Sequence, residues 1–256
     1  MPCENSQVSK PDEFRWYAKK AKSRGGYVGW DDFYPEYLKA PYKKYLALFQ
    51  TSVRNPKVLE LCCGMGEFSF DIAQITQGEV LAVDISPESI SICNEHLGTT
   101  KQKNLQFKVA DVENLELPEK RFDIICMSGS LSYLNLDVLL SNIKKWLKPE
   151  GRFIVVDTYG YSPIFNLKRR LNYLFGKTTK QTVLGIPRED TLNRIKSYFE
   201  QTGVDFFGIF AFLGPFLKYI IGDRKTAKFV DFLDRKFSFL RKYAFKFVLN
   251  SKGLKS

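Results

Sequence analysis

The chain has 256 residues, of which 44% are apolar and 26% charged, so it can bury the core of one ordinary to large domain. Its five cysteines include no Cys-x-x-Cys pair, which argues against a zinc site and a disulfide framework, and we expect no metal. The net charge of +11 at pH 7 indicates attraction to anionic partners.

The N-terminal region is polar at first and then aromatic. Its opening residues, Met-Pro-Cys-Glu-Asn-Ser-Gln, lack the basic region and the apolar stretch of a signal peptide, so we expect a cytoplasmic protein. Residues 1–12 show no periodicity and are predicted to be disordered, whereas residues 13–256 are predicted to form a single domain. Residues 13–50 are rich in aromatic side chains and are interrupted by Gly25-Gly26, which predicts two helices with a glycine hinge.

Residues 55–160 alternate between short apolar runs and helical segments. Strands are predicted at 57–62, 79–84, 105–110, 122–127 and 152–157, and helices at 67–77, 87–97 and 136–147. Such alternation with short connections predicts an α/β fold with a doubly wound parallel sheet, whose ligands bind at the carboxyl ends of the strands. The polar residues at the ends of these strands should share one edge of the sheet: Glu60, Asp84, Asp111, Ser128 and Asp157.

The first of these strands ends in a glycine turn. Gly64 and Gly66 follow it directly and lead into a helical segment. Such a turn leaves backbone N–H groups pointing into a cleft, which a nucleotide-like ligand can approach without meeting a Cβ atom. Asp84 and Asp111 close the next two strands, and carboxylates accept hydrogen bonds from hydroxyl and amine groups. The pattern therefore predicts a ligand that is rich in both groups.

Glu60 with Gly64 and Gly66, the acidic Asp84, and Val109-Ala-Asp111-Val112 together resemble class I methyltransferases that use S-adenosylmethionine. The resemblance spans about residues 55–160 and implies a Rossmann-like fold with a seven-stranded, mostly parallel sheet. It also implies that the glycine loop lies against the methionine part of the cofactor, that Asp84 holds the ribose hydroxyls, and that Asp111 reads the adenine amine. The cofactor-binding residues expected in the core are Glu60, Cys62, Gly64, Gly66, Asp84, Ile85, Asp111, Val112 and Ser128.

The chain departs from the family at Cys62, where the family usually has a glycine. A side chain at this position narrows the floor of the loop and bears on cofactor affinity. The rival interpretation of the loop is a nicotinamide dinucleotide site, in which Ser69 replaces the third glycine of Gly-x-Gly-x-x-Gly. Glu60 before the loop and Asp111 after the third strand argue against it, because a nicotinamide site requires neither.

The resemblance gives the aromatic residues 13–50 a role as a lid over the cofactor. Aromatic rings attract a sulfonium as they attract an ammonium, and Tyr17 and Trp30 are the expected contacts. Core packing of these helices is the alternative. Methyl transfer is an in-line displacement that needs alignment of the acceptor more than a catalytic group, so no catalytic residue is identified. The single histidine, His96, is predicted on a solvated helix face, and an imidazole base is not expected.

Groups that bind the acceptor are expected after the fourth and fifth strands, at Tyr133 and Tyr159. A basic insertion at 162–187 also starts at this edge and contains Lys168, Arg169 and Arg170 but no acid. Three adjacent cations indicate an anionic acceptor, such as a phosphate, pyrophosphate or carboxylate. Solvated surface charge is the alternative.

The C-terminal part combines apolar and basic segments. After a helix at 188–202 and a strand at 204–212, residues 213–242 are predicted to form a helical insertion with a basic amphipathic helix at 225–241. Residues 243–249 suit a seventh strand, antiparallel beside the sixth. If the basic helix packs on the sheet, its lysines are a solvated face. If it is loosely attached, we expect peripheral contact with the inner membrane face.

The sequence thus predicts a methyltransferase that uses S-adenosylmethionine and acts on a small-molecule or lipid-linked acceptor. The first choice is O-methylation of an anionic, sugar or isoprenoid-type substrate, and carbon or nitrogen acceptors remain open. An enzyme that modifies RNA and a noncatalytic interaction module with the same fold are the alternatives from other classes. Nucleic acid is not the expected partner, because the chain contains no recognised RNA-binding module.

Overall fold

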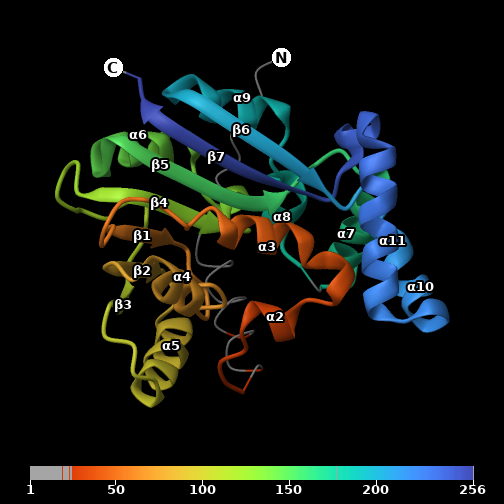
Figure 1. Cartoon of the computed structure of the whole chain (residues 1–256), viewed down its shortest axis with the longest axis horizontal. Helices are drawn as coiled ribbons and strands as arrows, with labels where there is room; N and C mark the ends of the chain where they lie inside the picture. Colours follow the sequence, from red (N-terminus) through yellow and green to blue (C-terminus); the bar gives the residue numbers. More distant parts are fainter. Residues whose placement is uncertain (1–18, 20–22, 24, 177, 256) are drawn as a thin grey trace.

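The computed structural model describes residues 19, 23, 25–176 and 178–255. The segment 1–12, which was predicted to be disordered, lies outside these residues. Seven strands form one sheet in the order β3-β2-β1-β4-β5-β7-β6 (Figure 1). β7 is antiparallel to both of its neighbours, and all other pairs are parallel. The predicted seven-stranded, mostly parallel sheet and the antiparallel pairing of the last strand beside the sixth are therefore confirmed.

The strands place their carboxyl ends in register. Leu61 at the end of the first strand pairs with Val83 of the second and Met127 of the fourth, and Ser128 pairs with Val156. Parallel strands in register bring the residues that follow them to a common edge. The strands are β1 Val58–Leu61, β2 Val80–Asp84, β3 Leu105–Val109, β4 Phe122–Ser128, β5 Leu147–Thr158, β6 Phe199–Phe207 and β7 Lys246–Leu254.

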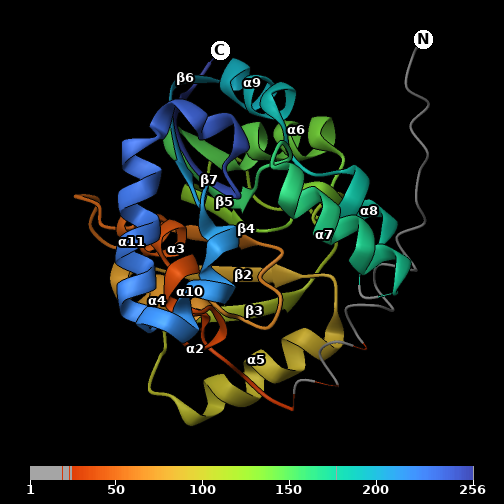
Figure 2. The same ribbon diagram turned by 90° about the vertical axis from the view of Figure 1, so that its right-hand side faces the viewer.

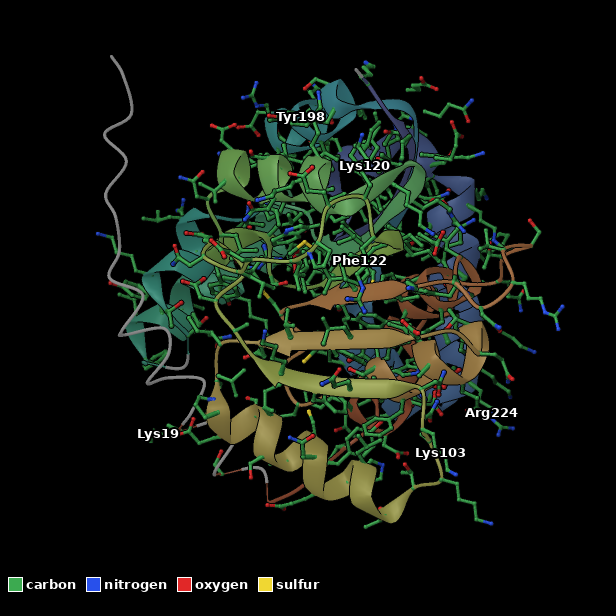
Figure 3. All side chains as sticks on the ribbon, turned by 90° about the vertical axis from the view of Figure 1, so that its left-hand side faces the viewer. Lys19, Lys103, Lys120, Phe122, Tyr198 and Arg224 are labelled. Atoms are coloured by element: carbon green, nitrogen blue, oxygen red, sulfur yellow. The ribbon has the colours of Figure 1, made fainter. Side chains whose placement is uncertain are left out.

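Helices cover both faces of the sheet, so the central strands read as continuous apolar runs. One face packs on α3, α4 and α5, and the other on α6 and α9. Figure 3 shows β1, β2 and β3 one below the other, with α5 running beneath β3. The described helices are α2 Trp30–Phe33, α3 Ala40–Ala47, α4 Ser69–Thr76, α5 Pro87–Thr99, α6 Leu136–Trp146, α7 Pro163–Leu174, α8 Lys180–Leu184, α9 Glu189–Tyr198, α10 Gly214–Ile221 and α11 Asp223–Lys236. Short 3-10 turns are η1 Glu36–Leu38, η2 Leu131–Tyr133, η3 Ala211–Leu213 and η4 Ser238–Tyr243.

Local capping explains where two core helices begin. The hydroxyl of Ser86 accepts a hydrogen bond from the Ser89 amide at 3.2 Å, and Pro87 occupies the first position of α5. At the start of α6, the side chain of Asn135 accepts from two backbone amides of the first turn, at 3.1 and 3.3 Å. Both helices start as the sequence predicted, directly after the loops that carry polar residues at the sheet edge.

The predicted boundary between the helix at 188–202 and the strand at 204–212 is wrong. The helix ends at Tyr198, and β6 starts at Phe199 and passes through Gly203, which pairs with Asn250 of β7. A glycine after a helical pattern usually ends the helix, but here the backbone hydrogen bonds of the long β7 extend the strand across it. The burial of Phe199 in the core favours the same arrangement.

The C-terminal helices lie at one end of the strands. Figure 1 shows α10 and α11 beyond one end of the strands, and Figure 2 looks onto this side, with α11 at the left and α7 and α8 at the right. α11 packs on η1 and α10, and its buried residues are Thr226 and Val230. The predicted basic helix at 225–241 is therefore divided into α11 and η4. It is held at the end of the sheet, because Asp234 accepts hydrogen bonds from the Gly208 and Phe210 amides after β6 and Leu240 packs against the core. Among the described residues, no helix has both the length and the apolar composition needed to cross a bilayer.

Candidate functional site

The loop between β1 and α4 has the conformation that its glycines allow. The φ angles of Gly64 and Gly66 are 58° and 77°, in the left-handed region that glycine adopts at little cost. A Cβ atom on Gly66 would lie 3.1 Å from the Sγ atom of Cys93 and 3.3 Å from the ring of Phe70. The glycine therefore allows the loop to pack closely on α5 and α4.

Asp84 at the end of β2 holds this loop in place. Its Oδ2 atom accepts a hydrogen bond from the Gly64 amide at 2.8 Å, and its Oδ1 atom accepts from the Ser86 amide at 2.9 Å. Burial raises the pKa of Asp84, and the two backbone hydrogen bonds oppose this shift. Each carboxylate oxygen has further acceptor capacity, so the same group can also accept from ligand hydroxyls. The predicted meeting of the glycine loop and Asp84 is present.

Glu60 lies below the loop rather than on its surface. The side chain is 2% exposed and accepts a hydrogen bond from the Ser69 hydroxyl at 2.5 Å. Burial raises its pKa to about 8, the hydrogen bond from Ser69 lowers it, and the charges of Glu67 and Asp84 raise it further. Glu60 is therefore mostly protonated at neutral pH and ties β1 to the start of α4. A direct contact with a cofactor stays a prediction.

The residues after β3 form a fixed turn at the same edge. Asp111 accepts hydrogen bonds from the Glu113 amide at 3.1 Å and from the Asn114 side chain at 2.8 Å. Val112 is buried, and its carbonyl accepts from Asn142 of α6 at 3.1 Å. By contrast, Ile85 after β2 is 40% exposed and offers an apolar surface to a ligand.

Cys62 occupies the centre of the site in a glycine-like conformation. Its φ angle is 54°, which for a residue with a side chain costs on the order of 1 kcal/mol. Burial raises the pKa of the thiol, and the charges of Asp84, Asp111 and Glu113 add to the shift. The neutral thiol thus sits among the groups that end three successive strands.

The loop after β4 is tied to β5 through Asp157. Asp157 is 3% exposed and accepts hydrogen bonds from the Leu131 amide at 2.9 Å and from the Thr158 amide at 2.6 Å. Gly129, directly after Ser128, donates to the Val156 carbonyl at 2.9 Å. The buried hydroxyl of Ser130 lies beside the Cys62 thiol and has no hydrogen bond of good geometry within the described residues. Ser128 and Asp157 therefore reach the predicted edge.

The predicted acceptor-binding residues occupy different environments. Tyr159 is 2% exposed, and its hydroxyl donates to Glu189 at 2.8 Å, so it belongs to the core. Tyr133 is half-buried in η2, after β4. Lys168 and Arg170 are exposed, whereas Arg169 is half-buried and turns toward Asp157. The basic insertion thus brings one of its three adjacent cations to the sheet edge.

Sequence reasoning missed Lys246, the first residue of β7. It is 8% exposed and lies near Asp157 and Arg169. The signal in the sequence was a lysine between Phe245 and Phe247. Lys246 pairs with Thr158 at the end of β5, which places it at the carboxyl edge of the parallel strands. A lysine is rarely buried in an apolar strand without a partner. The position of Lys246 could therefore have indicated a functional residue, but the alternating aromatic residues around it indicated only a strand.

The N-terminal segment packs on the glycine loop. Trp30 is 9% exposed, and its ring lies 6.2 Å from that of Phe68 and 6.4 Å from that of Tyr42. These ring contacts agree with the alternative that the aromatic residues pack in the core. A contact of Trp30 with the cofactor stays a prediction. Tyr17 lies outside the described residues. His96 was predicted on a solvated face, but its ring stacks on Tyr27 at 3.9 Å because the N-terminal segment covers that side of α5.

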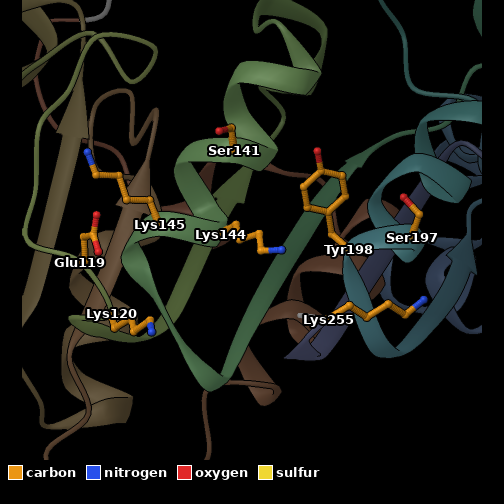
Figure 4. Close-up of a pocket in the computed structure, with 8 residues that line it drawn as sticks. All are labelled: Glu119, Lys120, Ser141, Lys144, Lys145, Ser197, Tyr198 and Lys255. Atoms are coloured by element: carbon orange, nitrogen blue, oxygen red, sulfur yellow. The ribbon is translucent and has the colours of Figure 1, made fainter.

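A hollow of about 510 Å³ lies at the opposite, amino edge of the parallel strands (Figure 4). It is lined by Glu119, Lys120, Ser141, Lys144, Lys145, Ser197, Tyr198 and Lys255. The residues that line it come before β4, from α6 before β5, from the end of α9 before β6, and after β7, so the hollow is separate from the site at the carboxyl edge. The described residues contain no cluster of histidine, cysteine and acidic side chains able to hold a metal ion.

Comparison with known sequences gives one family match and several partial relatives. A family described as a methyltransferase domain matches residues 52–199. Phosphoethanolamine N-methyltransferase 3 of Arabidopsis thaliana is 33% identical over 108 residues, which are 42% of this chain and 22% of the relative. Malonyl-[acyl-carrier protein] O-methyltransferase 1 of Ilyobacter polytropus is 31% identical over 144 residues, 56% of this chain and 53% of the relative. The chain thus spans about half or less of the length of these relatives.

Two solved structures share the fold. Geranyl diphosphate C-methyltransferase from Streptomyces coelicolor aligns with a TM-score of 0.58 and 16% identity, over 99% of this chain and 90% of that chain. Phosphoethanolamine N-methyltransferase 2 of Haemonchus contortus aligns with a TM-score of 0.60 and 16% identity, over 84% of this chain and 53% of that chain. At these identities the likeness concerns the fold.

Proposed function

Because the chain belongs to the class I S-adenosylmethionine-dependent methyltransferases, we propose that it transfers a methyl group from this cofactor to a small-molecule acceptor. The observation that carries the proposal is the junction of Asp84 with the glycine loop, where one carboxylate accepts the Gly64 amide at 2.8 Å. Because Gly64 and Gly66 have no side chains, a ligand can approach the backbone of the loop closely. At the same edge, Asp84 can accept hydrogen bonds from ribose hydroxyls.

The residues at the edge fit the cofactor in type and position. Ile85 offers an exposed apolar surface next to Asp84, and Asp111 stands at the end of the neighbouring strand. When bound, the cofactor supplies an activated methyl group. The chain's own residues then have to bind it, align the acceptor and exclude water. The aromatic N-terminal helices, packed on the loop through Trp30, would exclude water from one side.

An oxygen atom of the acceptor is our first choice as the methylated atom. Asp157 is a buried carboxylate whose pKa is raised by burial, and it accepts a hydrogen bond from the loop that contains Ser130. Such a pair can orient a hydroxyl group and receive its proton. The names of the relatives include N-, O- and C-methyltransferases, and the acceptors named in them carry phosphate, diphosphate or carboxylate groups. An anionic, sugar or isoprenoid-type acceptor, free or lipid-linked, is consistent with this set.

Equilibrium dialysis with S-adenosylmethionine tests the proposal first. Saturable binding that Asp84→Ala weakens supports it, whereas no binding to the intact protein would favour a noncatalytic module. Incubation with labelled cofactor and fractionated cell extract then identifies the acceptor by a mass increase of one methyl group. Transfer to RNA in place of small molecules would overturn the substrate class.

We also propose that the protein contacts an anionic membrane surface through α10, α11 and η4. Phe216, Tyr219, Ile220 and Phe239 are 73%, 82%, 77% and 75% exposed, which is unusual for such large apolar side chains. The neighbouring elements α11 and η4 and their flanks carry exposed cations: Arg224, Lys225, Lys228, Arg235, Lys236, Arg241 and Lys242. Exposed apolar side chains on elements that also carry many cations fit an interface of anionic headgroups, to which each cation contributes about 1 kcal/mol.

Co-sedimentation with vesicles tests this contact. The protein should bind vesicles that contain phosphatidylserine and should bind phosphatidylcholine vesicles much less. Replacing Phe216, Tyr219 and Ile220 by serine should reduce binding without changing the far-ultraviolet circular dichroism, because these side chains are exposed. Equal binding of this variant would show that the surface is not a membrane contact.

A further inference from the structure

Three charged side chains meet where β5 ends and the antiparallel β7 begins. Asp157 comes from β5, Lys246 from β7 and Arg169 from α7, and the electrostatic influence of each reaches the others. Asp157 and Lys246 are 3% and 8% exposed. Two cations thus face one carboxylate in a nearly dry environment, which leaves an excess of positive charge.

Aromatic rings and one amide hold the two cations in position. The ammonium of Lys246 lies 5.1 Å from the centre of the Tyr42 ring and 5.5 Å from that of Phe245. The guanidinium of Arg169 lies 5.7 Å from the Phe245 ring, and its Nη1 atom donates to Asn166 at 2.6 Å. These contacts fix the directions of both side chains without neutralising either charge.

Part of the Arg169 guanidinium is unsatisfied. Its Nη2 atom is buried and has no hydrogen-bond partner among the described residues. Asp157 does not accept a hydrogen bond from this Nη2 atom, because the hydrogen bonds to the carboxylate come from the backbone amides of Leu131 and Thr158. An unpaired buried donor is costly, and so is a second buried cation beside a single acid. Burial lowers the pKa of Lys246 to about 8, which Asp157 opposes, so the ammonium form persists at neutral pH.

The cluster borders the cofactor loop. Tyr42, over which Lys246 lies, has its ring 5.3 Å from that of Phe68, which follows the glycine turn. On its other side, Asp157 fixes the loop after β4 that contains Ser130. The cluster is therefore linked through Tyr42 to the residue that follows the glycine turn and through Asp157 to the loop after β4.

We propose that Arg169 and Lys246 form a subsite for an oxyanion of the acceptor, a phosphate or carboxylate group. This inference rests on the proposed function and names the chemical class of its substrate. A guanidinium fork and an ammonium complement the oxygens of such a group, and the incoming anion provides the missing partner of Nη2. Binding of the anion places the rest of the acceptor toward Ser130 and the cofactor loop.

The neighbours of Arg169 provide matched controls. Lys168 and Arg170 adjoin it in α7 and carry the same charge, but both are exposed. If general attraction by the basic insertion bound the anion, Lys168→Gln and Arg170→Gln would weaken binding as much as Arg169→Gln. In a built subsite, the loss is confined to Arg169→Gln and Lys246→Gln.

Calorimetric titration of the protein with pyrophosphate, at constant ionic strength, tests the subsite. The intact protein should bind pyrophosphate saturably, and Arg169→Gln and Lys246→Gln should each weaken binding about tenfold or more. Lys168→Gln and Arg170→Gln should change it less than about twofold, and Lys246→Arg should retain most of it. Titrations with malonate and with a water-soluble isoprenyl phosphate then separate a carboxylate, a free phosphate and a lipid-linked phosphate as the source of the oxyanion.

Measuring S-adenosylmethionine binding by the same samples distinguishes a failure of the oxyanion subsite from a failure of the proposed function. If the intact protein binds S-adenosylmethionine but no oxyanion, or if all four glutamine variants lose the same affinity, the subsite is refuted and the proposed function stands. If the intact protein binds no S-adenosylmethionine, the proposed function fails. Retention of cofactor affinity by Arg169→Gln and Lys246→Gln shows that these variants fold.

Discussion

Replacing Glu60 by glutamine should stabilise the protein at neutral pH. Glu60 is buried beneath the cofactor loop, and its pKa is raised from 4.5 to about 8, chiefly by burial. At pH 7 the folded protein must therefore keep a proton on this carboxyl group, whereas the unfolded chain releases it. Glutamine has nearly the same shape as the protonated acid and requires no proton uptake, and its amide can still meet the Ser69 hydroxyl.

The magnitude follows from the two pKa values. Below pH 4.5 both states hold the proton, and the carboxyl group makes no pH-dependent contribution. Between pH 4.5 and pH 8 the folded state binds one proton more than the unfolded state, so the free energy of unfolding falls by about 1.4 kcal/mol per pH unit. At pH 7 the accumulated cost is on the order of 3 kcal/mol, and above pH 8 it no longer grows.

Urea denaturation at pH 5, 6, 7 and 8 measures this effect. The difference in unfolding free energy between Glu60→Gln and the unchanged protein should widen as the pH rises, and other titrating groups cancel because both proteins contain them. Glu79→Gln is the control, since Glu79 is exposed and lies at the other end of the sheet. A difference that stays constant with pH would show that Glu60 is ionised in the folded protein and would refute the reasoning.

Three further substitutions test other parts of the site. Asp84→Ala removes the acceptor expected for the ribose hydroxyls and should weaken S-adenosylmethionine binding by about 1 to 3 kcal/mol in equilibrium dialysis; unchanged affinity would remove Asp84 from the site. Cys62→Gly relieves a left-handed φ angle and opens the loop floor, so cofactor affinity measured by calorimetry should rise, and a fall would mean that the thiol contributes a contact. Tyr159→Phe removes the hydrogen bond to Glu189 and should lower the unfolding free energy by about 1 kcal/mol while leaving KM for the acceptor unchanged; a raised KM would place Tyr159 in the acceptor site.

The cofactor side of the site could be predicted because its geometry is local. Asp84 and Gly64 are 20 residues apart, but Asp84 ends β2 and Gly64 lies in the turn after β1, and neighbouring parallel strands bring their ends together. Capping at Ser86 and Pro87 likewise depends on adjacent residues. Such contacts can be predicted from adjacent residues and from the order of the strands alone.

The charged cluster that we propose as the acceptor subsite could not be predicted in the same way. Lys246 meets Asp157 only because β7 inserts between β5 and β6, and Arg169 meets them because α7 folds back over the same edge. Sequence periodicity also could not tell which of three adjacent cations turns inward. At Gly203 a common helix-ending signal was overridden by pairing with a strand that lies far along the chain.

The position of β7 also sets an order of assembly. Its neighbours β5 and β6 both precede it in the chain, and neither pairs with the other, so the far part of the sheet stays open until residues 246–254 are in place. The half formed by β1 to β4 can thus pair during synthesis without any later strand, whereas the half that contains β5 and β6 closes last.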